Sequence, residues 1–168
     1  MSGVKSSYNK KHVDAIQGVI DKKFPLVKKN PNSIEWTSRH TDSYNCIAWA
    51  MGEDYRWWWP VGSPIDKNYW PAEAPKDVTV EAFDIAFSTK GYKTCRNGDF
   101  KEGVEKVALY IDEDGLPTHA ARMLRDGVWA SKLGPSIDIH HTHEALQSSS
   151  SGKSSYGVVG KYYSRKKK

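Results

Sequence analysis

Cys46 and His119 are the residues whose types and order in the chain match a thiol nucleophile and its general base. The reactive form of cysteine is the thiolate, and the pKa of a free cysteine is about 8.5. A helix N-terminus and a nearby imidazolium both lower that pKa. Residues 41–45 contain several helix-capping residue types, and Gly52 closes the apolar run that follows them. We therefore expect a buried helix over about residues 44–51, with Cys46 in its first turn.

His119 lies on a predicted strand, residues 118–124, which a tight turn at 126–127 connects to the next strand. A third residue normally orients the imidazole of the base. The length of the turn decides which residue of the second strand is able to do so. A two-residue turn puts Lys132 on the face of His119, whereas a three-residue turn puts Ser131 there.

Asp138 is the residue that we expect to orient the base, because it is the nearest downstream carboxylate apart from the one in the turn. Ser131 and His140 are the alternatives. A lysine beside the histidine would lower its pKa, so lysine is a poor orienting residue. Backbone N–H groups in the first turn of the helix would stabilise a developing oxyanion, with Asn45 or His40 as an additional side-chain donor.

Aromatic residues are concentrated in the segment after the predicted cysteine helix. Prolines and glycines interrupt this segment, so we expect a long ordered loop there. Aromatic walls suit sugars, peptides or bases, and an arginine beside them pairs with a carboxylate. The residues that we assign to substrate binding are Asn45, Arg56, Trp57, Trp58, Trp59 and Trp70. The alternative is that the tryptophans hold the loop against the core.

The segment 138–144 contains an aspartate, three histidines and a glutamate, which are residue types that bind metals. A zinc hydrolase is therefore an alternative, but the simpler interpretation is a polar surface run before the serine-rich stretch 148–155. The two cysteines, Cys46 and Cys95, are too few for a disulfide framework or a cysteine-based zinc site. We predict no metal and no cofactor, and a structural role on a strand for Cys95.

Helical patterns precede strand patterns along the chain. Residues 1–35 predict an amphipathic helix and a connector, residues 36–164 the main domain, and residues 165–168 a basic tail. Another helix is expected between Thr79 and Gly91. Strands are predicted at about 91–95, 105–111, 118–124, 128–133 and 156–163. This order predicts an α+β fold with N-terminal helices packed on an antiparallel β-sheet meander.

The chain has 168 residues and a formal net charge of +5. It is long enough to bury a core without disulfides. No apolar run approaches the roughly 18 residues that span a bilayer, and the polar N-terminus does not look like a signal peptide. We therefore expect a cytoplasmic protein with no membrane partner. The basic residues gather at the chain ends and no nucleic-acid-binding motif is present, so nucleic acid is not the expected partner.

Four strings carry a resemblance to known families: YNCIAWA at 44–50, RWWWP at 56–60, THAAR at 118–122 and WASKLG at 129–134. A cysteine that starts a buried helix, followed by a histidine early on a downstream strand, resembles the papain-like superfamily of cysteine peptidases and amidases, which includes bacterial cell-wall amidases. The strings also resemble an uncharacterised bacterial domain family over about residues 24–163. The CGSCW signature of true papains is absent, so the resemblance is to the superfamily and not to a close papain relative.

The resemblance implies a papain-like α+β fold and a cysteine hydrolase that acts on a peptide, a protein or another amide-containing substrate. Cys46 would attack the acyl carbon, and His119 would accept and return the proton. The alternative function is a non-catalytic protein-interaction module, in which the tryptophan-rich loop contacts a protein partner. A nucleic-acid binder ranks third.

Overall fold

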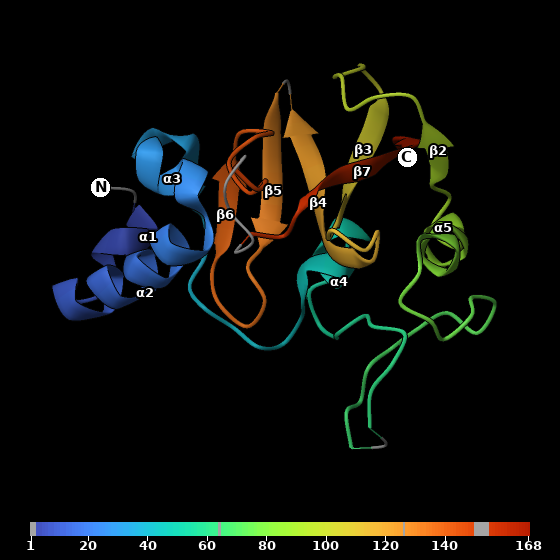
Figure 1. Ribbon diagram of the computed structural model, residues 1–168, viewed down its shortest axis with the longest axis horizontal. Helices are drawn as coiled ribbons and strands as arrows, with labels where there is room; N and C mark the ends of the chain where they lie inside the picture. The colour runs from blue at the N-terminus through green and yellow to red at the C-terminus, as the bar shows by residue number, and fades with distance from the viewer. Residues whose placement is uncertain (1–2, 64, 126, 150–154) are drawn as a thin grey trace.

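An antiparallel sheet forms the centre of the computed structural model, which describes residues 3–63, 65–125, 127–149 and 155–168 (Figure 1). Its strands are β1 (Ile34–Trp36), β2 (Lys93–Cys95), β3 (Val104–Ile111), β4 (Pro117–Arg125), β5 (Val128–Lys132), β6 (Asp138–His141) and β7 (Val158–Lys166). Across the sheet they follow the order β1-β6-β5-β4-β3-β7-β2. The strands β3, β4 and β5 form the predicted meander, β6 extends it, and β7 returns to pair with both β3 and the edge strand β2. The predicted α+β class is confirmed.

The helices in the described ranges are α1 (Gly3–Ser6), α2 (Lys10–Lys23), α3 (Pro25–Lys29), α4 (Cys46–Ala50) and α5 (Val80–Ser88), and a 3-10 turn (Pro31–Ser33) precedes β1. Polar side chains cap three of them: Asn9 accepts from the His12 N–H at α2, Asn45 caps α4, and Thr79 accepts from the Ala82 N–H at α5. Pro25 suits the first position of α3, where no backbone donor is needed. In the described part of the chain, no helix is both long enough and apolar enough to cross a membrane.

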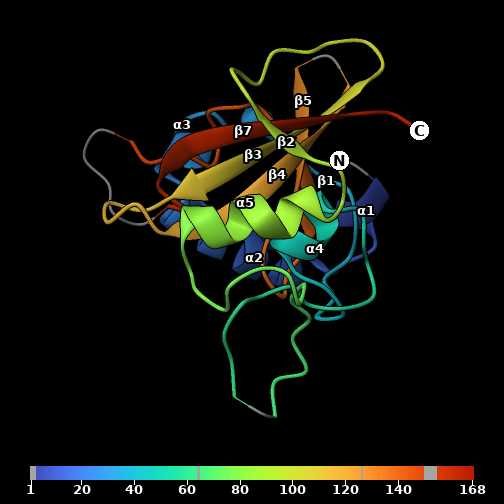
Figure 2. The same cartoon turned by 90° about the vertical axis from the view of Figure 1, so that its right-hand side faces the viewer.

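The sheet separates two hydrophobic clusters, because successive residues of a strand point to opposite faces. In β3, Val107 and Leu109 pack in the cluster that contains α4 and α5, whereas Ala108 and Tyr110 pack in the cluster that contains α2 and α3. Figure 2 shows α4 and α5 in front of the sheet and α3 behind it. The position of a residue within its strand therefore decides which helices its side chain meets.

An irregularity in the β4–β5 hairpin sets the face on which each residue lies. The pairs are Arg125–Val128, Met123–Trp129 and Arg122–Ala130, so Leu124 is an extra residue in β4. Arg125 pairs with Val128 as a two-residue turn requires, although Asp126 itself is outside the described residues. The bulge then shifts the register by one. Ser131 consequently shares a face with His119, and Lys132 does not.

Two segments differ from the sequence interpretation. The segment 138–144, interpreted above as a polar surface run, supplies β6, which pairs with β5 and β1 and buries Ile139 completely. The predicted basic tail is partly strand, because β7 continues to Lys166 and Arg165 pairs with Glu105. Residues 150–154 of the serine-rich stretch are outside the described residues.

Candidate active site

Cys46 is the first residue of α4, within the helix that the sequence predicted. The side-chain oxygen of Asn45 caps this helix by accepting from the Ala48 N–H at 3.1 Å, and it also accepts from the Trp58 N–H at 3.1 Å. The amide of Asn45 donates to the Trp58 carbonyl at 2.8 Å. Asn45 therefore joins the cysteine helix to the loop that follows it. Its amide is engaged there and is not a free donor for an oxyanion.

The Cys46 thiol is almost completely buried, since only 7 % of the residue is exposed. Its sulfur lies against the backbone N–H groups of Ala120 in β4 and Ile47 in α4. Burial raises the pKa of the thiol to about 11, and the N–H groups oppose this shift only in part. At neutral pH the buried Cys46 is therefore a thiol and not a thiolate.

His119 is fully buried in β4, on the face that also carries Tyr110. Its ring stacks on Tyr156, with 3.9 Å between the centroids and 4° between the ring planes. Nε2 lies 2.9 Å from Ser131 Oγ, whereas Nδ1 is buried with no hydrogen-bond partner among the described residues. Burial lowers the pKa of His119 well below its usual value, so the ring is neutral.

Hydrogen bonds beyond His119 determine which of its nitrogens carries the proton. His141 Nδ1 lies 2.7 Å from the carbonyl of Thr142, and a carbonyl only accepts, so this nitrogen carries the His141 proton. Burial lowers the pKa of His141 to about 4, and its neutral Nε2 accepts from Ser131 Oγ at 2.7 Å. The Ser131 oxygen then accepts from His119 Nε2. His119 Nδ1 is left with a free lone pair, which is the form that a general base needs.

The structure brings the Cys46 thiol and the His119 ring to the same short stretch of β4 without joining them. The sulfur contacts Ala120, the residue after His119, and both groups interact electrostatically with Lys23. Tyr156, which stacks on His119, also interacts electrostatically with Cys46. No hydrogen bond links the sulfur to His119 within the described residues. The helix α4 packs on the face of the sheet opposite to the one that carries His119 and Tyr110.

Ser131, and not Asp138, is the residue in contact with the His119 ring. Asp138 lies on the α4 face, where its Oδ2 accepts from the Tyr44 hydroxyl at 2.6 Å. His140 alternates with His141 in β6 and shares the face of Asp138. The expectation that Asp138 orients the base therefore disagrees with this geometry. The physical reason is the β4–β5 bulge, which puts a serine in the position beside the histidine.

The tryptophan-rich loop, residues 53–79, leaves the body of the protein after α4 (Figure 1). At its base the buried Glu53 accepts from Arg56 Nε at 2.6 Å, Trp58 Nε1 at 2.6 Å and Lys90 Nζ at 2.9 Å. Burial alone raises the pKa of Glu53, but these hydrogen bonds outweigh it and lower the pKa to about 2. Trp58 is completely buried. Arg56 and Trp58 therefore hold the base of the loop.

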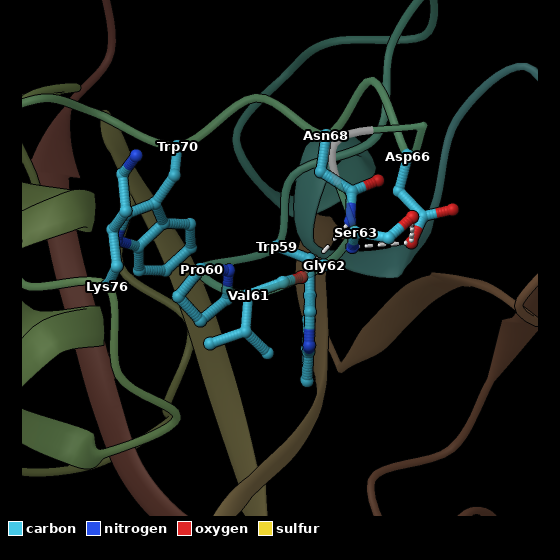
Figure 3. A pocket seen from close by; sticks show the side chains of 9 residues that line it. All are labelled: Trp59, Pro60, Val61, Gly62, Ser63, Asp66, Asn68, Trp70 and Lys76. Carbon is cyan, nitrogen blue, oxygen red and sulfur yellow. Dashed lines mark hydrogen bonds between the residues drawn. The ribbon is translucent and has the colours of Figure 1, made fainter.

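Trp59 and Trp70 line a pocket of about 470 Å³ farther along this loop (Figure 3). Both rings pack on Phe83 of α5. Two polar side chains of the pocket are bonded within the loop, since Asp66 accepts from Ser63 and Asn68 donates to the Val61 carbonyl. Trp57 is outside the pocket lining and donates its ring N–H to the Asp42 carbonyl. Of the predicted substrate-binding tryptophans, Trp59 and Trp70 thus line this cavity.

His141 and Tyr156 belong to the site, although neither was predicted to act with His119. The signal for His141 was the alternation in Asp-Ile-His-His, which places His141 on the face of Ser131 once β6 is recognised as a strand. No sequence signal marks Tyr156 as a partner of His119. It lies two residues before β7, and its carbonyl accepts from Thr118 Oγ1 at 2.5 Å.

Metal-binding residue types do not converge in the described part of the chain, where no group of three such side chains is close enough to hold an ion. The three histidines of 138–144 are separated by the strand. His140 and His141 lie on opposite faces, and His143 Nε2 bonds the Tyr162 hydroxyl at 2.5 Å. Cys95 lies in the edge strand β2, with its sulfur 3.4 Å from the Asn97 carbonyl.

Fold and site together define an α+β protein with a cysteine at the start of a buried helix and a buried His–Ser–His chain in the adjoining sheet. The model of one protein family, a domain of unknown function (DUF7689), matches residues 35–164, and the chain belongs to this family. No curated protein and no solved structure matches the chain.

Proposed function

We propose that this protein is a papain-like cysteine hydrolase that acts on an amide or related acyl bond, with Cys46 as nucleophile and His119 as general base. The observation that carries the proposal is the buried lone pair on His119 Nδ1, which has no hydrogen-bond partner in the described part of the chain. The hydrogen bonds from Nε2 through Ser131 and His141 to the Thr142 carbonyl hold the ring in this tautomer. A buried nitrogen without a partner is costly, so its retention suits a functional role.

In the proposed reaction, the Cys46 sulfur forms a bond to the acyl carbon while its proton passes to His119 Nδ1. The tetrahedral intermediate collapses when the carbon–nitrogen bond breaks, and the leaving amine takes the proton from Nδ1. Water then attacks the thioester, gives its proton to Nδ1, and releases the acid and the thiol. Ser131 positions the imidazole and does not touch the reacting atoms.

Burial has a consequence for how the nucleophile is activated. The pKa of the thiol is about 11 and that of His119 is lowered, so the resting pair is neutral and not a thiolate–imidazolium pair. Proton transfer must therefore accompany the attack on the substrate. The proposal requires substrate binding to bring Sγ and Nδ1 into line, as often happens when catalytic hydrogen bonds tighten.

Acyl-enzyme formation tests the proposal. The protein is mixed with p-nitrophenyl acetate at pH 8, p-nitrophenol release is followed, and the acid-quenched protein is analysed by mass spectrometry with peptide mapping. We expect one acetyl group on Cys46, and the same burst in Cys95→Ser. Cys46→Ser should show no burst, and His119→Gln should acylate at least about 100-fold more slowly.

Ser131→Ala separates positioning from folding. It should slow acylation about tenfold or more while thermal unfolding confirms an intact fold, because Ser131 acts only through the tautomer of His119. Acylation of Cys95 as fast as of Cys46, or a rate in His119→Gln equal to that of the unchanged protein, would show that Cys46 is an ordinary buried thiol.

The second candidate function is a protein-interaction module that uses the tryptophan-rich loop. The observation in its favour is exposed apolar surface at the loop, where Ile65 is 88 % exposed and Val61 46 %. In a pull-down with the purified chain as bait, this function predicts that Ile65→Asp and Val61→Asp lose bound protein while Cys46→Ser does not. Equal capture by all variants would exclude it.

A further inference from the structure

Two adjoining cavities follow the outer side of α2. One, of about 450 Å³, is lined by Ile16, Val19 and Ile20 of α2 and by Leu133 and Pro135 of the β5–β6 turn. The other, of about 440 Å³, shares Ile16 and Pro135 and continues towards the N-terminus of α2. Together they form one groove, which we call the α2 groove, between α2 and the turn at residues 133–136. Each part has the size of a small-molecule site.

The walls of the α2 groove are apolar and partly open to water. Val19 is 67 % exposed although its side chain lies in the groove between two other apolar residues of α2. Ile16 lies one helical turn before both Val19 and Ile20, and Ile20 belongs to the buried cluster. An extended apolar chain lying along α2 would remove this surface from water, at roughly 25 cal/mol per Å².

Charge in the groove has one sign. Lys23 lines one end and Arg39 lines the other, and none of the described carboxylates lines either cavity. The Lys23 ammonium is half-buried and lies 4.2 Å from the centre of the Tyr156 ring. No aspartate or glutamate forms an ion pair with it in the described ranges. Burial accordingly lowers the pKa of Lys23.

A half-buried cation with no anionic partner among the described residues, at the end of an apolar channel, is complementary to a ligand that has an apolar chain and an anionic end. We propose that the α2 groove binds an apolar carboxylate, with the carboxylate on Lys23 and the apolar chain along α2 towards Pro135. The site lies one ring away from the candidate base, because Tyr156 lines the groove and stacks on His119. The inference goes beyond the proposed function and does not depend on Cys46 as a nucleophile.

Titration calorimetry with dodecanoate tests the proposal, at pH 8 and below the concentration at which dodecanoate aggregates. Two matched probes separate chain from charge: dodecyltrimethylammonium has the chain with the opposite charge, and acetate has the carboxylate without the chain. We expect one dodecanoate per protein, and binding of each matched probe at least about tenfold weaker. Equal affinity for the cationic probe would mean that Lys23 plays no part, and this overturns the proposal.

Matched variants on α2 locate the ligand. Lys23→Gln should weaken dodecanoate binding about tenfold or more, whereas Lys22→Gln, at an exposed position outside the groove, should not change it. Val19→Glu places a carboxylate in the groove and should abolish binding, while Lys22→Glu serves as its control. Val19 is exposed, so its substitution leaves the core intact, and circular dichroism checks this.

Three further outcomes overturn the inference: no dodecanoate binding at millimolar concentration, unchanged affinity in Lys23→Gln, or equal affinity in Val19→Glu and Lys22→Glu. Cys46→Ser should bind dodecanoate normally. Loss of acylation with retained dodecanoate binding therefore counts against the proposed hydrolase alone, and the reverse pattern counts against the groove alone.

Discussion

Acid should destabilise this protein through its two buried neutral histidines, and His141 permits an estimate of the size of the effect. Its pKa falls from 6.5 to about 4 because burial disfavours the charged ring. In the unfolded chain the same ring protonates at about 6.5. As the pH falls below 6.5, protons bind the unfolded state first and pull the equilibrium towards it.

The pKa of His141 is about 2.5 lower in the folded protein than in the unfolded chain, and a pKa difference of one corresponds to about 1.4 kcal/mol. His141 alone should therefore lower the free energy of unfolding by about 2 kcal/mol between pH 7.5 and pH 5, and by about 3 kcal/mol once the pH is below 4. The pKa of His119 is shifted in the same direction, so its contribution has the same sign. The contribution of His141 to stability is fully present above pH 6.5 and is lost as the pH falls from 6.5 to 4.

Urea unfolding between pH 7.5 and pH 5 measures this effect when the protein is compared with His141→Gln. The substitution will change stability at every pH, so the informative quantity is the slope and not the level. The carboxylates contribute equally to both proteins and cancel in the difference. Between pH 7.5 and pH 5, the free energy of unfolding of His141→Gln should fall by about 2 kcal/mol less than that of the unchanged protein. Parallel curves would refute the assignment of His141 as a buried neutral ring, and with it the tautomer of His119.

Three further predictions concern the elements that hold the site. Glu53→Gln should lower the free energy of unfolding by about 3 kcal/mol above pH 4.5 and not below pH 2, because the hydrogen bonds that lower the pKa of Glu53 stabilise the fold only while its carboxylate is ionised. Urea unfolding at pH 7 and at pH 2 tests both limits. Gly157→Ala should lower the free energy of unfolding by at least about 2 kcal/mol and shift the ring resonances of His119, because a Cβ at Gly157, whose φ is +90°, would lie 1.8 Å from the Ile111 carbonyl oxygen. The control Gly115→Ala has a positive φ but open space around the Cβ, and it should lower the free energy of unfolding by about 1 kcal/mol. Equal losses of stability in the two variants would contradict the steric argument. Lys132→Met should lower the free energy of unfolding by about 2 kcal/mol and increase amide hydrogen exchange at residues 133–136, because the Lys132 ammonium donates to the carbonyls of Thr41, Gly134 and Ser136. Unchanged exchange would show that the turn at 133–136 does not depend on Lys132.

Much of the fold follows from local signals in the sequence. Caps and closing glycines located α4 and α5, and the change from helical spacing to alternation located the β3–β4–β5 hairpins. The short strand β1 has only three residues, too few for a period to show, and it exists because β6 offers it an edge. The alternation in β6 was visible, but its polar residues favoured a surface interpretation.

The candidate site was only partly predictable, for a reason of register. His119 and Ser131 were both identified, yet their contact depended on the residue count of one hairpin, which the sequence left open between two values. The tight turn was recognised and the bulge at Leu124 was not, since no residue type marks it. The stacking of Tyr156 on His119 is a tertiary contact that no local pattern encodes.

The bulge at Leu124 also makes chain length at this hairpin a constraint of its own. Exposed hairpin tips usually tolerate insertions and deletions. Here a deletion of one residue from β4 would restore the simple ladder and rotate the two strands relative to each other by one position, which exchanges Ser131 for Lys132 beside His119. The ammonium group of a lysine has no acceptor and so cannot accept a hydrogen bond from the Nε2–H of His119. Insertions or deletions of an even number of residues keep the serine on the face of His119, whereas those of an odd number move it to the other face. An odd or even difference in the number of residues between the histidine and the serine should therefore separate relatives that retain the His–Ser–His chain from those that do not.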